Sequence, residues 1–327
     1  MKIKKKRDRR MFSVICILTF LISFGIGVIS KIAVKPSWAK KYSVSMTDKI
    51  GKVYKDIPYG DGKANKFDLY IPADAGKENC GLVVYLHAGG FTQGDKADDA
   101  DMLAWLCSKG YLAAGINYTL RTDENGKSVY SQSLEIKEAV PEVVKEAERL
   151  GYHINKMAVS GGSAGGTLAM LYAYRDAKDS PVPVKMMFEA VGPSSFYRSD
   201  WGSYGLDLDT DESRKSAAAL FSVMLGSEID AELIDTENYD ELIKPISAFM
   251  WIDKNSVPSV IAYGAQDRVC PFKTVAHLVN ALKENGVDYQ YFEMPHSGHG
   301  LQNDNKLYEQ YMNAVETYLN KYMPAEK

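Results

Sequence analysis

The chain has 327 residues, of which 46% are hydrophobic, 25% charged and 11% aromatic, a composition typical of one large α/β domain or two small ones. Residues 1–39 carry nine basic residues and one acidic residue, so residues 40–327 hold a net charge of −11 within the total of −3. An acidic body of this kind argues against nucleic-acid binding, because phosphates require a basic surface.

The chain begins with a basic segment that leads into an apolar run over residues 11–30. This run exceeds the roughly 7–15 apolar residues of a signal-peptide core and matches the roughly 20 residues of a membrane-spanning helix. We therefore expect an uncleaved signal anchor within residues 1–35, with its basic end in the cytoplasm. Cleavage after Ala39 is the alternative, because Ser37 and Ala39 place small residues at positions −3 and −1. The two alternatives predict a membrane-anchored and a secreted protein, respectively.

The four cysteines do not form a recognisable framework. Cys16 lies in the apolar run, and Cys80, Cys107 and Cys270 are scattered along the rest of the chain. Without a CxxC motif or a cluster of cysteines and histidines, the sequence offers no zinc site. We expect the three later cysteines to be buried free thiols.

Residues 36–50 are predicted to form a polar linker, after which strand and helix patterns alternate. KFDLYI at 66–71 alternates polar and apolar residues, as a half-exposed strand should, whereas the later strand patterns are mostly apolar. Strands are predicted at 66–71, 82–86, 112–117, 157–161, 185–191, 259–264 and 289–294, and helices at 98–109, 133–151, 164–175, 271–286 and 304–322. This alternation predicts βαβ units and a mostly parallel sheet flanked by helices, an α/β fold.

The interval 195–250 interrupts this alternation with acidic patches and short helical segments. Because it lies between two predicted core strands, we expect a small cap-like insertion that covers one end of the sheet. Four aromatic residues of the insertion are candidates to shape a pocket, although core packing is the better explanation for any one of them: Phe196, Tyr197, Trp201 and Tyr204.

The segment SGGSAGG at 160–166 surrounds one serine with glycines and an alanine. Its central residues match the pattern G-x-S-x-G, and it lies between a predicted strand and a predicted helix, which is the context of a nucleophile elbow. We expect Gly161 and Gly165 to be small so that neighbouring backbone can approach closely. Ser163 would then project above the sheet as a candidate nucleophile.

A serine hydroxyl needs a base and an orienting carboxylate, and in hydrolases with such an elbow both follow the serine in the chain. Asp267 follows the predicted strand 259–264, and His299 follows the predicted strand 289–294. Both therefore occupy carboxyl ends of strands, where α/β sheets place their sites. Asp253 and Glu189 are weaker candidates for the acid.

The remaining histidines have other expected roles. We prefer His299 to His296 as the base because glycines flank His299, while His296 follows a proline and is expected to lie beside the base in a supporting role. His153 precedes a strand at the opposite end of the sheet and is expected on the surface. His277 has core spacing in a predicted helix, which favours packing.

The segment LHAGGFTQGD at 86–95 directly follows a predicted strand. A tetrahedral intermediate needs donors for its oxyanion, and Gly89 and Gly90 can turn their amides inward to join the amide of Ala164. His87 is then expected to hold this loop by hydrogen bonds and not to act as a base. An ordinary glycine turn is the alternative explanation.

Together these motifs resemble the α/β-hydrolase superfamily, specifically its esterase/lipase group with an HGGG-type oxyanion loop, which includes hormone-sensitive-lipase-like and BD-FAE-like carboxylesterases. The likeness covers roughly residues 50–322, and the matching segments are HAGGF (87–91), INYTL (116–120), SGGSAGG (160–166), GAQDRVCP (264–271) and HSGHG (296–300). The resemblance departs from the usual pattern at two positions. Ala88 replaces the first glycine, and Thr119 replaces the arginine of a YRL motif, which puts a hydrogen-bond network there in doubt.

The resemblance implies an α/β-hydrolase catalytic domain over residues 51–325, with Ser163 as nucleophile, Asp267 as acid and His299 as base, and with Gly89, Gly90 and Ala164 as the oxyanion hole. It implies a serine carboxylesterase that removes small acyl groups, such as acetyl or feruloyl, from alcohols or sugars, without a metal or a cofactor. One alternative is a prolyl-oligopeptidase-like exopeptidase, although the sequence lacks a clear acidic pair to bind a free amino terminus. The other alternative is an exported binding module that has lost the chemistry.

Overall fold

The computed structural model describes residues 41–325. The predicted anchor, the cleavage site after Ala39 and residues 36–40 of the predicted linker lie outside the described residues. Among residues 41–325, no helix combines the length and apolarity that crossing a bilayer requires. The chain divides into two compact units, Met1–Tyr42 and Ser43–Lys327, and all the described strands belong to the second unit.

The core of the second unit is one eight-stranded sheet with the spatial order β1-β2-β4-β3-β5-β6-β7-β8. The first two pairings, β1 with β2 and β2 with β4, are antiparallel, and all the others are parallel. The strands are β1 Gly51–Pro58, β2 Lys66–Pro72, β3 Cys80–Leu86, β4 Leu112–Ile116, β5 Ile154–Gly162, β6 Val184–Ala190, β7 Ser259–Gly264 and β8 Tyr289–Met294. The predicted mostly parallel sheet is therefore confirmed.

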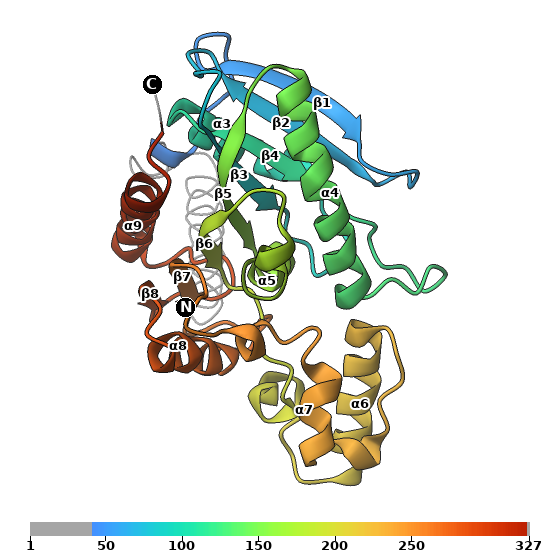
Figure 1. Ribbon diagram of the computed structural model, residues 1–327. Helices are drawn as coiled ribbons and strands as arrows, with labels where there is room; N and C mark the ends of the chain where they lie inside the picture. The colour runs from blue at the N-terminus through green and yellow to red at the C-terminus, as the bar shows by residue number, and fades with distance from the viewer. Residues whose placement is uncertain (1–40, 326–327) are drawn as a thin grey trace, which may run out of the picture. The chain divides into compact units, whose positions relative to one another are not determined.

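Helices cover both faces of this sheet (Figure 1). One face is covered by α4 and α5, and the other by α3 and α9, while α8 lies beyond β7 and β8. The bounds of these helices are α3 Ala100–Ser108, α4 Val129–Arg149, α5 Ala164–Leu171, α8 Thr274–Glu284 and α9 Asn305–Tyr322. The longest of them, α4, begins at the N-cap Ser128 and buries apolar residues at helical spacing, including Ile136, Val140 and Val143.

Three details differ from the sequence predictions. The strand β1 was not expected, because its sequence GKVYKDIP is polar. It lies at the edge of the sheet and pairs with a neighbour on one side only. Strand β2 is buried nearly throughout and is not half-exposed, since its Asp68 forms an ion pair at 3.2 Å with the buried Lys96. The helix predicted from residue 164 leaves α-geometry after Leu171 and continues as a wider π-helical turn over Tyr172–Asp176.

Between β6 and β7 the chain forms two helices, α6 Asp211–Leu225 and α7 Glu237–Ile243, and several short 3₁₀ turns. Figure 1 shows α6 and α7 at the end of the molecule farthest from β1 and β2. Phe196 and Trp201 are buried in this segment and pack with Phe221 of α6 at centroid distances of 5.6–5.9 Å. These two aromatic residues therefore serve core packing, while Tyr204 remains 48% exposed.

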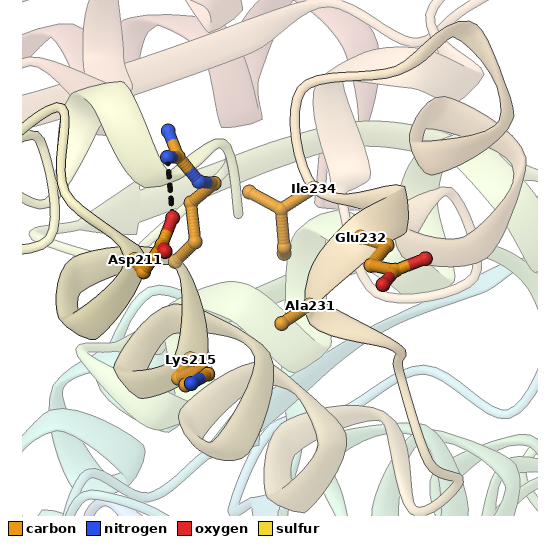
Figure 2. Close-up of a pocket in the computed structure, with 6 residues that line it drawn as sticks. Asp211, Lys215, Ala231, Glu232 and Ile234 are labelled. Carbon is orange, nitrogen blue, oxygen red and sulfur yellow. Dashed lines mark hydrogen bonds and ion pairs between the residues drawn. The ribbon is translucent and has the colours of Figure 1, made fainter.

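Within this same segment, α6 and the turn Ala231–Leu233 line a pocket of about 540 Å³ that is open to solvent (Figure 2). Its lining includes Asp211 and Lys215 from α6 and Glu232 from the turn that faces them. The Asp211 carboxylate pairs with Arg214 at 2.8 Å. The lining contains none of the residues that the sequence predicts for catalysis.

Candidate active site

Ser163 occupies the sharp turn between the end of β5 and the start of α5. Its backbone has φ 52° and ψ −121°, a combination that residues with a side chain rarely adopt. Two hydrogen bonds hold this conformation, from the Ser163 amide to the Ala190 carbonyl at 2.8 Å and from the Thr167 amide to the Ser163 carbonyl at 3.0 Å. The strain therefore lies at the residue that the sequence singles out as the candidate nucleophile.

The glycines around Ser163 are required by close backbone contacts. A Cβ on Gly165 would lie 1.9 Å from the Leu86 carbonyl oxygen, and one on Gly161 would lie 2.4 Å from the Gly165 carbonyl carbon. At Gly162 the nearest atom would be 3.9 Å away, so this position has room for a methyl group. The expectation that Gly161 and Gly165 let neighbouring backbone approach is confirmed.

The structure brings the three candidate catalytic side chains together. Ser163 Oγ lies 2.8 Å from His299 Nε2, and His299 Nδ1 lies 2.7 Å from Asp267 Oδ2. With Nδ1 donating to the carboxylate, Nε2 is left as an acceptor for the serine hydroxyl proton. The carboxylate of Asp267 is fully buried, whereas the imidazole is 26% exposed. This arrangement can pass a proton between Ser163 and a bound molecule.

The second carboxylate oxygen of Asp267 is held by its own loop. Oδ1 accepts hydrogen bonds from the amides of Val269 at 2.8 Å and Cys270 at 3.0 Å. The carbonyl of Val269 in turn accepts a hydrogen bond at 2.8 Å from the hydroxyl of Tyr204, in the 195–250 insertion. Sequence analysis did not identify this contact, because it joins residues far apart in the chain.

The weaker candidates for the acid lie elsewhere. Asp253 is exposed, and its carboxylate accepts from the nearby amide of Asn255. Glu189 is fully buried in β6, where its carboxylate accepts from the Gly192 amide at 2.9 Å. Burial raises the pKa of Glu189 to about 8, although the Gly192 amide and the Tyr263 hydroxyl act in the opposite direction. Neither residue is hydrogen bonded to His299.

The loop after β8 carries both candidate histidines. His296 points its ring toward Asp304 at 2.9 Å, and its side chain is 78% exposed. The buried Ser297 hydroxyl donates to the same Asp304 carboxylate at 2.7 Å, which closes the loop around His299. A Cβ on Gly264 would lie 2.4 Å from the Gly298 carbonyl oxygen, so this glycine allows the loops after β7 and β8 to touch.

The loop after β3 contains the predicted oxyanion donors. Gly89 and Gly90 have φ values of 129° and 59°, which favour glycine. The Gly89 carbonyl accepts from the Gln93 amide at 3.0 Å, so the Gly90 amide of the same peptide points the opposite way. No hydrogen bond recorded within residues 41–325 uses the amides of Gly89, Gly90 or Ala164. These three donors are therefore available to a ligand.

His87 holds this loop and is not part of the serine–histidine contact. Its Nδ1 donates to the Ala88 carbonyl at 2.7 Å, and its ring stacks on Tyr118 with centroids 4.3 Å apart. Burial lowers the pKa of His87, which favours the neutral imidazole. The expected structural role of His87 is therefore confirmed.

The other two histidines are also accounted for. His153 is exposed just before β5, as expected. His277 is half-buried against Tyr197 and Phe249, and its Nε2 lies 3.1 Å from Asp200. The expected packing of His277 is thus accompanied by an ion pair.

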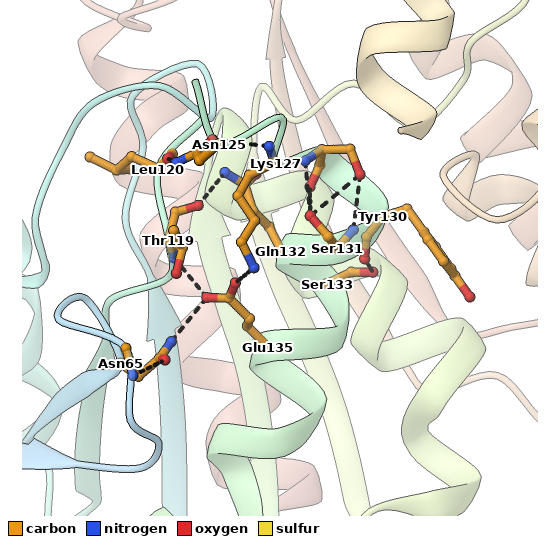
Figure 3. Close-up of polar contacts among 12 residues, drawn as sticks. Asn65, Thr119, Leu120, Asn125, Lys127, Tyr130, Ser131, Gln132, Ser133 and Glu135 are labelled. Carbon is orange, nitrogen blue, oxygen red and sulfur yellow. Dashed lines mark hydrogen bonds and ion pairs between the residues drawn. The ribbon is translucent and has the colours of Figure 1, made fainter. Parts of the chain in front are cut away.

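Polar side chains of α4 bond to the backbone of Thr119, the position at which the resemblance leads one to expect an arginine (Figure 3). Glu135 accepts from the Thr119 amide at 2.7 Å and from Lys127 Nζ at 2.6 Å. Gln132 donates to the Thr119 carbonyl at 2.9 Å and to the Phe91 carbonyl at 2.8 Å. A network is therefore present despite Thr119. Sequence analysis did not identify Gln132, because no motif marks a side chain that binds distant carbonyls.

The structure also locates the cysteines and the possible metal ligands within residues 41–325. No group of three or more histidine, cysteine or acidic side chains in this range could hold a metal ion. Cys80, Cys107 and Cys270 are buried as expected, and burial raises the pKa of Cys107 to about 12. Burial also raises the pKa of Cys270, so it disfavours the nucleophilic thiolate form of Cys107 and Cys270.

The chain is similar to known esterases. Esterase LipC of Mycobacterium tuberculosis is 23% identical over 247 residues, which are 75% of this chain and 59% of LipC, so the match spans less than two thirds of that relative. The esterase Est2 of Thermogutta terrifontis has a TM-score of 0.64 at 20% identity, covering 84% of this chain and 93% of its own. A truncated carbohydrate esterase from gut microbiota has a TM-score of 0.66 at 16% identity, covering 85% and 98%. These structures establish that the chain has the α/β-hydrolase fold.

The family follows from a match to more than half of the chain. The profile of the BD-FAE family matches residues 67–282, a range that begins in β2 and ends in α8. It contains the elbow, the oxyanion loop and Asp267, while His299 lies beyond its end. The chain therefore belongs to the BD-FAE family of α/β-hydrolases.

Proposed function

We propose that this chain is a serine carboxylester hydrolase that acts through Ser163, His299 and Asp267 on short-chain or carbohydrate-linked acyl esters. The observation that carries the proposal is the pair of hydrogen bonds, 2.8 Å from Ser163 to His299 and 2.7 Å from His299 to Asp267, at a strained elbow. A serine hydroxyl is a weak nucleophile unless a base removes its proton, and this geometry supplies the base and its orienting acid.

The reaction proceeds in two halves. Ser163 Oγ attacks the ester carbonyl carbon while its proton passes to His299 Nε2, and the resulting imidazolium is stabilised by Asp267. The tetrahedral intermediate collapses, His299 gives the proton to the leaving alcohol oxygen, and an acyl-enzyme remains. Water then attacks the acyl-enzyme with His299 as base, and the carboxylic acid and free Ser163 are released.

The oxyanion hole of this mechanism consists of the amides of Gly89, Gly90 and Ala164. Developing negative charge is best stabilised by donors that are already oriented and need no rearrangement. The Ala164 amide opens α5, where the helix dipole adds to its effect. The absence of recorded partners for these three amides within residues 41–325 supports this assignment.

The proposed substrate class is supported by the relatives and by the insertion. Structures of Thermogutta terrifontis Est2 include propionate-bound and butyrate-bound forms, and another neighbour is a carbohydrate esterase. In this chain, residues 195–250 form a cap-like insertion whose Tyr204 reaches the loop that carries Asp267. We assign this insertion to the wall of the acyl or alcohol pocket.

We also propose that residues 40–327 are exported. They are either held at the membrane by an N-terminal anchor within residues 1–35 or released by cleavage after Ala39. The basic segment followed by 20 apolar residues supports this location. Alkaline extraction of membranes separates the two forms, and N-terminal sequencing identifies the first residue of the released form. Recovery of the full chain in the cytosol would contradict export.

The decisive experiment compares hydrolysis of p-nitrophenyl acetate, butyrate and octanoate by the full chain and by Ser163→Ala. We expect turnover of the short esters, and a loss of about 10³-fold or more in kcat for Ser163→Ala. Ser160→Ala is the matched control, because Ser160 is a buried serine of β5 that takes no part in the triad.

Three outcomes distinguish the alternatives. Activity that is lost only in Ser163→Ala supports the esterase. Equal activity in the wild-type chain and in Ser163→Ala would show that Ser163 is not the nucleophile. If the wild-type chain and Ser163→Ala are both inactive on esters, cleavage of dipeptide p-nitroanilides by the wild-type chain would indicate an exopeptidase. Failure to cleave these p-nitroanilides as well would favour a binding module.

A further inference from the structure

Gln132 connects α4 to the loop that holds the oxyanion donors. Its side chain is fully buried near the start of α4, and its amide nitrogen donates to the Phe91 carbonyl at 2.8 Å and the Thr119 carbonyl at 2.9 Å. Figure 3 shows Gln132 reaching from the helix toward Thr119. One amide group therefore joins two segments that follow different strands, β3 and β4.

Phe91 has a backbone conformation that requires such support. It directly follows Gly89 and Gly90 and has φ +66°, a left-handed conformation that is unfavourable for a bulky residue. Its carbonyl also accepts from the Arg121 amide at 2.9 Å, so two donors from outside the loop converge on one oxygen. Such conformations persist only when the surrounding structure holds them in place.

The conformation of Phe91 determines where the preceding amides point. The amides of Thr92 and Gln93, just after Phe91, donate to the Gly89 carbonyl at 3.2 and 3.0 Å. These bonds orient the Gly89–Gly90 peptide and hence the Gly90 amide. If Phe91 relaxed to negative φ, the turn at residues 92–93 would swing away and release that peptide.

A buried glutamine at position 132 is not the side chain expected to make the fold most stable. Its side-chain oxygen is buried and has no hydrogen-bond partner within residues 41–325. An unpaired buried acceptor costs free energy that an apolar side chain of similar size would avoid. The presence of a glutamine at this position therefore indicates that its two donated hydrogen bonds are needed for something other than stability.

We propose that Gln132 is a positioning residue, which holds Phe91 in the left-handed conformation and thereby orients the Gly90 amide for oxyanion binding. This inference rests on the proposed esterase function. Gln132 itself does not touch the substrate. Its effect is exerted on the transition state, because the oxyanion forms only as the ester carbonyl is attacked.

The test replaces Gln132 in the full chain by Met, which keeps the volume and removes the donors, and by Asn, which is too short to reach both carbonyls. With p-nitrophenyl butyrate, we expect kcat to fall about 10- to 100-fold, while KM stays within about twofold. The inhibition constant of an alkyl trifluoromethyl ketone, whose adduct with serine carries an oxyanion, should rise by the same factor as kcat falls. Rates are normalised to the folded fraction measured by near-UV circular dichroism.

Asn65→Ala is the matched control. It removes a donor to Glu135, at 3.0 Å, from the same network without touching the Phe91 carbonyl, so it should lower the melting temperature and leave kcat unchanged. Unchanged kcat in folded Gln132→Met, or equal loss of kcat in Asn65→Ala, would overturn the proposal. Failure of both Gln132 variants to fold would also overturn it, because Gln132 would then be a stability residue. An inactive wild-type chain would instead refute the esterase function.

Discussion

Asp267 illustrates how single residues of this site are held from two directions. One carboxylate oxygen bonds to His299, and the other accepts from the amides of Val269 and Cys270. The backbone bonds fix the position of the carboxylate independently of the imidazole. Orientation and charge at this position can therefore be separated by mutation.

Asp267→Asn is expected to lower kcat by about 10³–10⁴-fold with little change in KM or melting temperature. The asparagine oxygen can still accept from the two loop amides, so the fold persists. Its NH₂ group, however, faces His299 Nδ1 as a donor, which forces the proton to Nε2 and blocks acceptance from Ser163. Steady-state kinetics of Asp267→Asn beside Asp253→Asn checks this, and a comparable loss in Asp253→Asn would contradict the assignment of the acid.

The candidate catalytic residues could be predicted because their signals are local. Ser163 is marked by its glycines, Asp267 and His299 by strand ends, and the glycines beside His299 favoured it over His296. Gln132 could not be predicted, since its role depends on two backbone carbonyls 41 and 13 residues away. Contacts of that kind leave no pattern in the sequence.

At the scale of elements, the elbow formed by β5, Ser163 and α5 depends on the close approach of β3. We expect Gly165→Ala to destabilise the protein by about 1–3 kcal/mol or more, because its Cβ would lie 1.9 Å from the Leu86 carbonyl oxygen, which cannot move without disturbing the sheet. The matched Gly162→Ala has 3.9 Å of space and should fold with near wild-type stability. Urea denaturation of both variants measures the difference, and equal stabilities would contradict the packing argument.

The elements that were predicted well are those that are buried. Strands β3, β4 and β7 are continuous apolar runs with buried residues on both faces, so composition alone identifies them. The edge strand β1 has a single buried residue, Gly51, and contains charged residues, which makes it resemble a loop in the sequence. The burial of β2 depends on the ion pair between its Asp68 and Lys96, which lies 28 positions later in the chain. The local sequence of β2 therefore does not show that the charge of Asp68 is neutralised.

At the scale of the whole second unit, polar contacts that join the insertion to the hydrolase core add to its packing. Asp200 of the insertion pairs with His277 of α8 at 3.1 Å. Tyr204 adds a hydrogen bond to the Asp267 loop. Because only the imidazole among these groups titrates near neutral pH, the attachment of the insertion should depend on pH.

The direction of this dependence follows from the ion pair. The hydrogen bond and charge of Asp200 raise the pKa of His277 above its ordinary value of about 6.5, although partial burial opposes this shift. A raised pKa in the folded state means that the stabilisation is fully present below pH 6.5 and is lost as the pH rises through the folded pKa. We therefore expect the segment 198–243 to exchange its amide hydrogens faster at pH 8.5 than at pH 6.0, after correction for intrinsic exchange rates.

Two variants isolate the contribution of the imidazole charge. His277→Gln keeps a donor toward Asp200 but cannot gain a proton, so its corrected exchange in α6 and α7 should be the same at both pH values. His153→Gln, which alters an exposed histidine before β5, should retain the wild-type pH dependence. Because Tyr204 donates to the Val269 carbonyl in the loop that carries Asp267, loosening at high pH should also raise KM for octanoate esters more than for acetate esters. A pH dependence that survives in His277→Gln would locate the titrating group elsewhere and contradict the ion pair as the attachment.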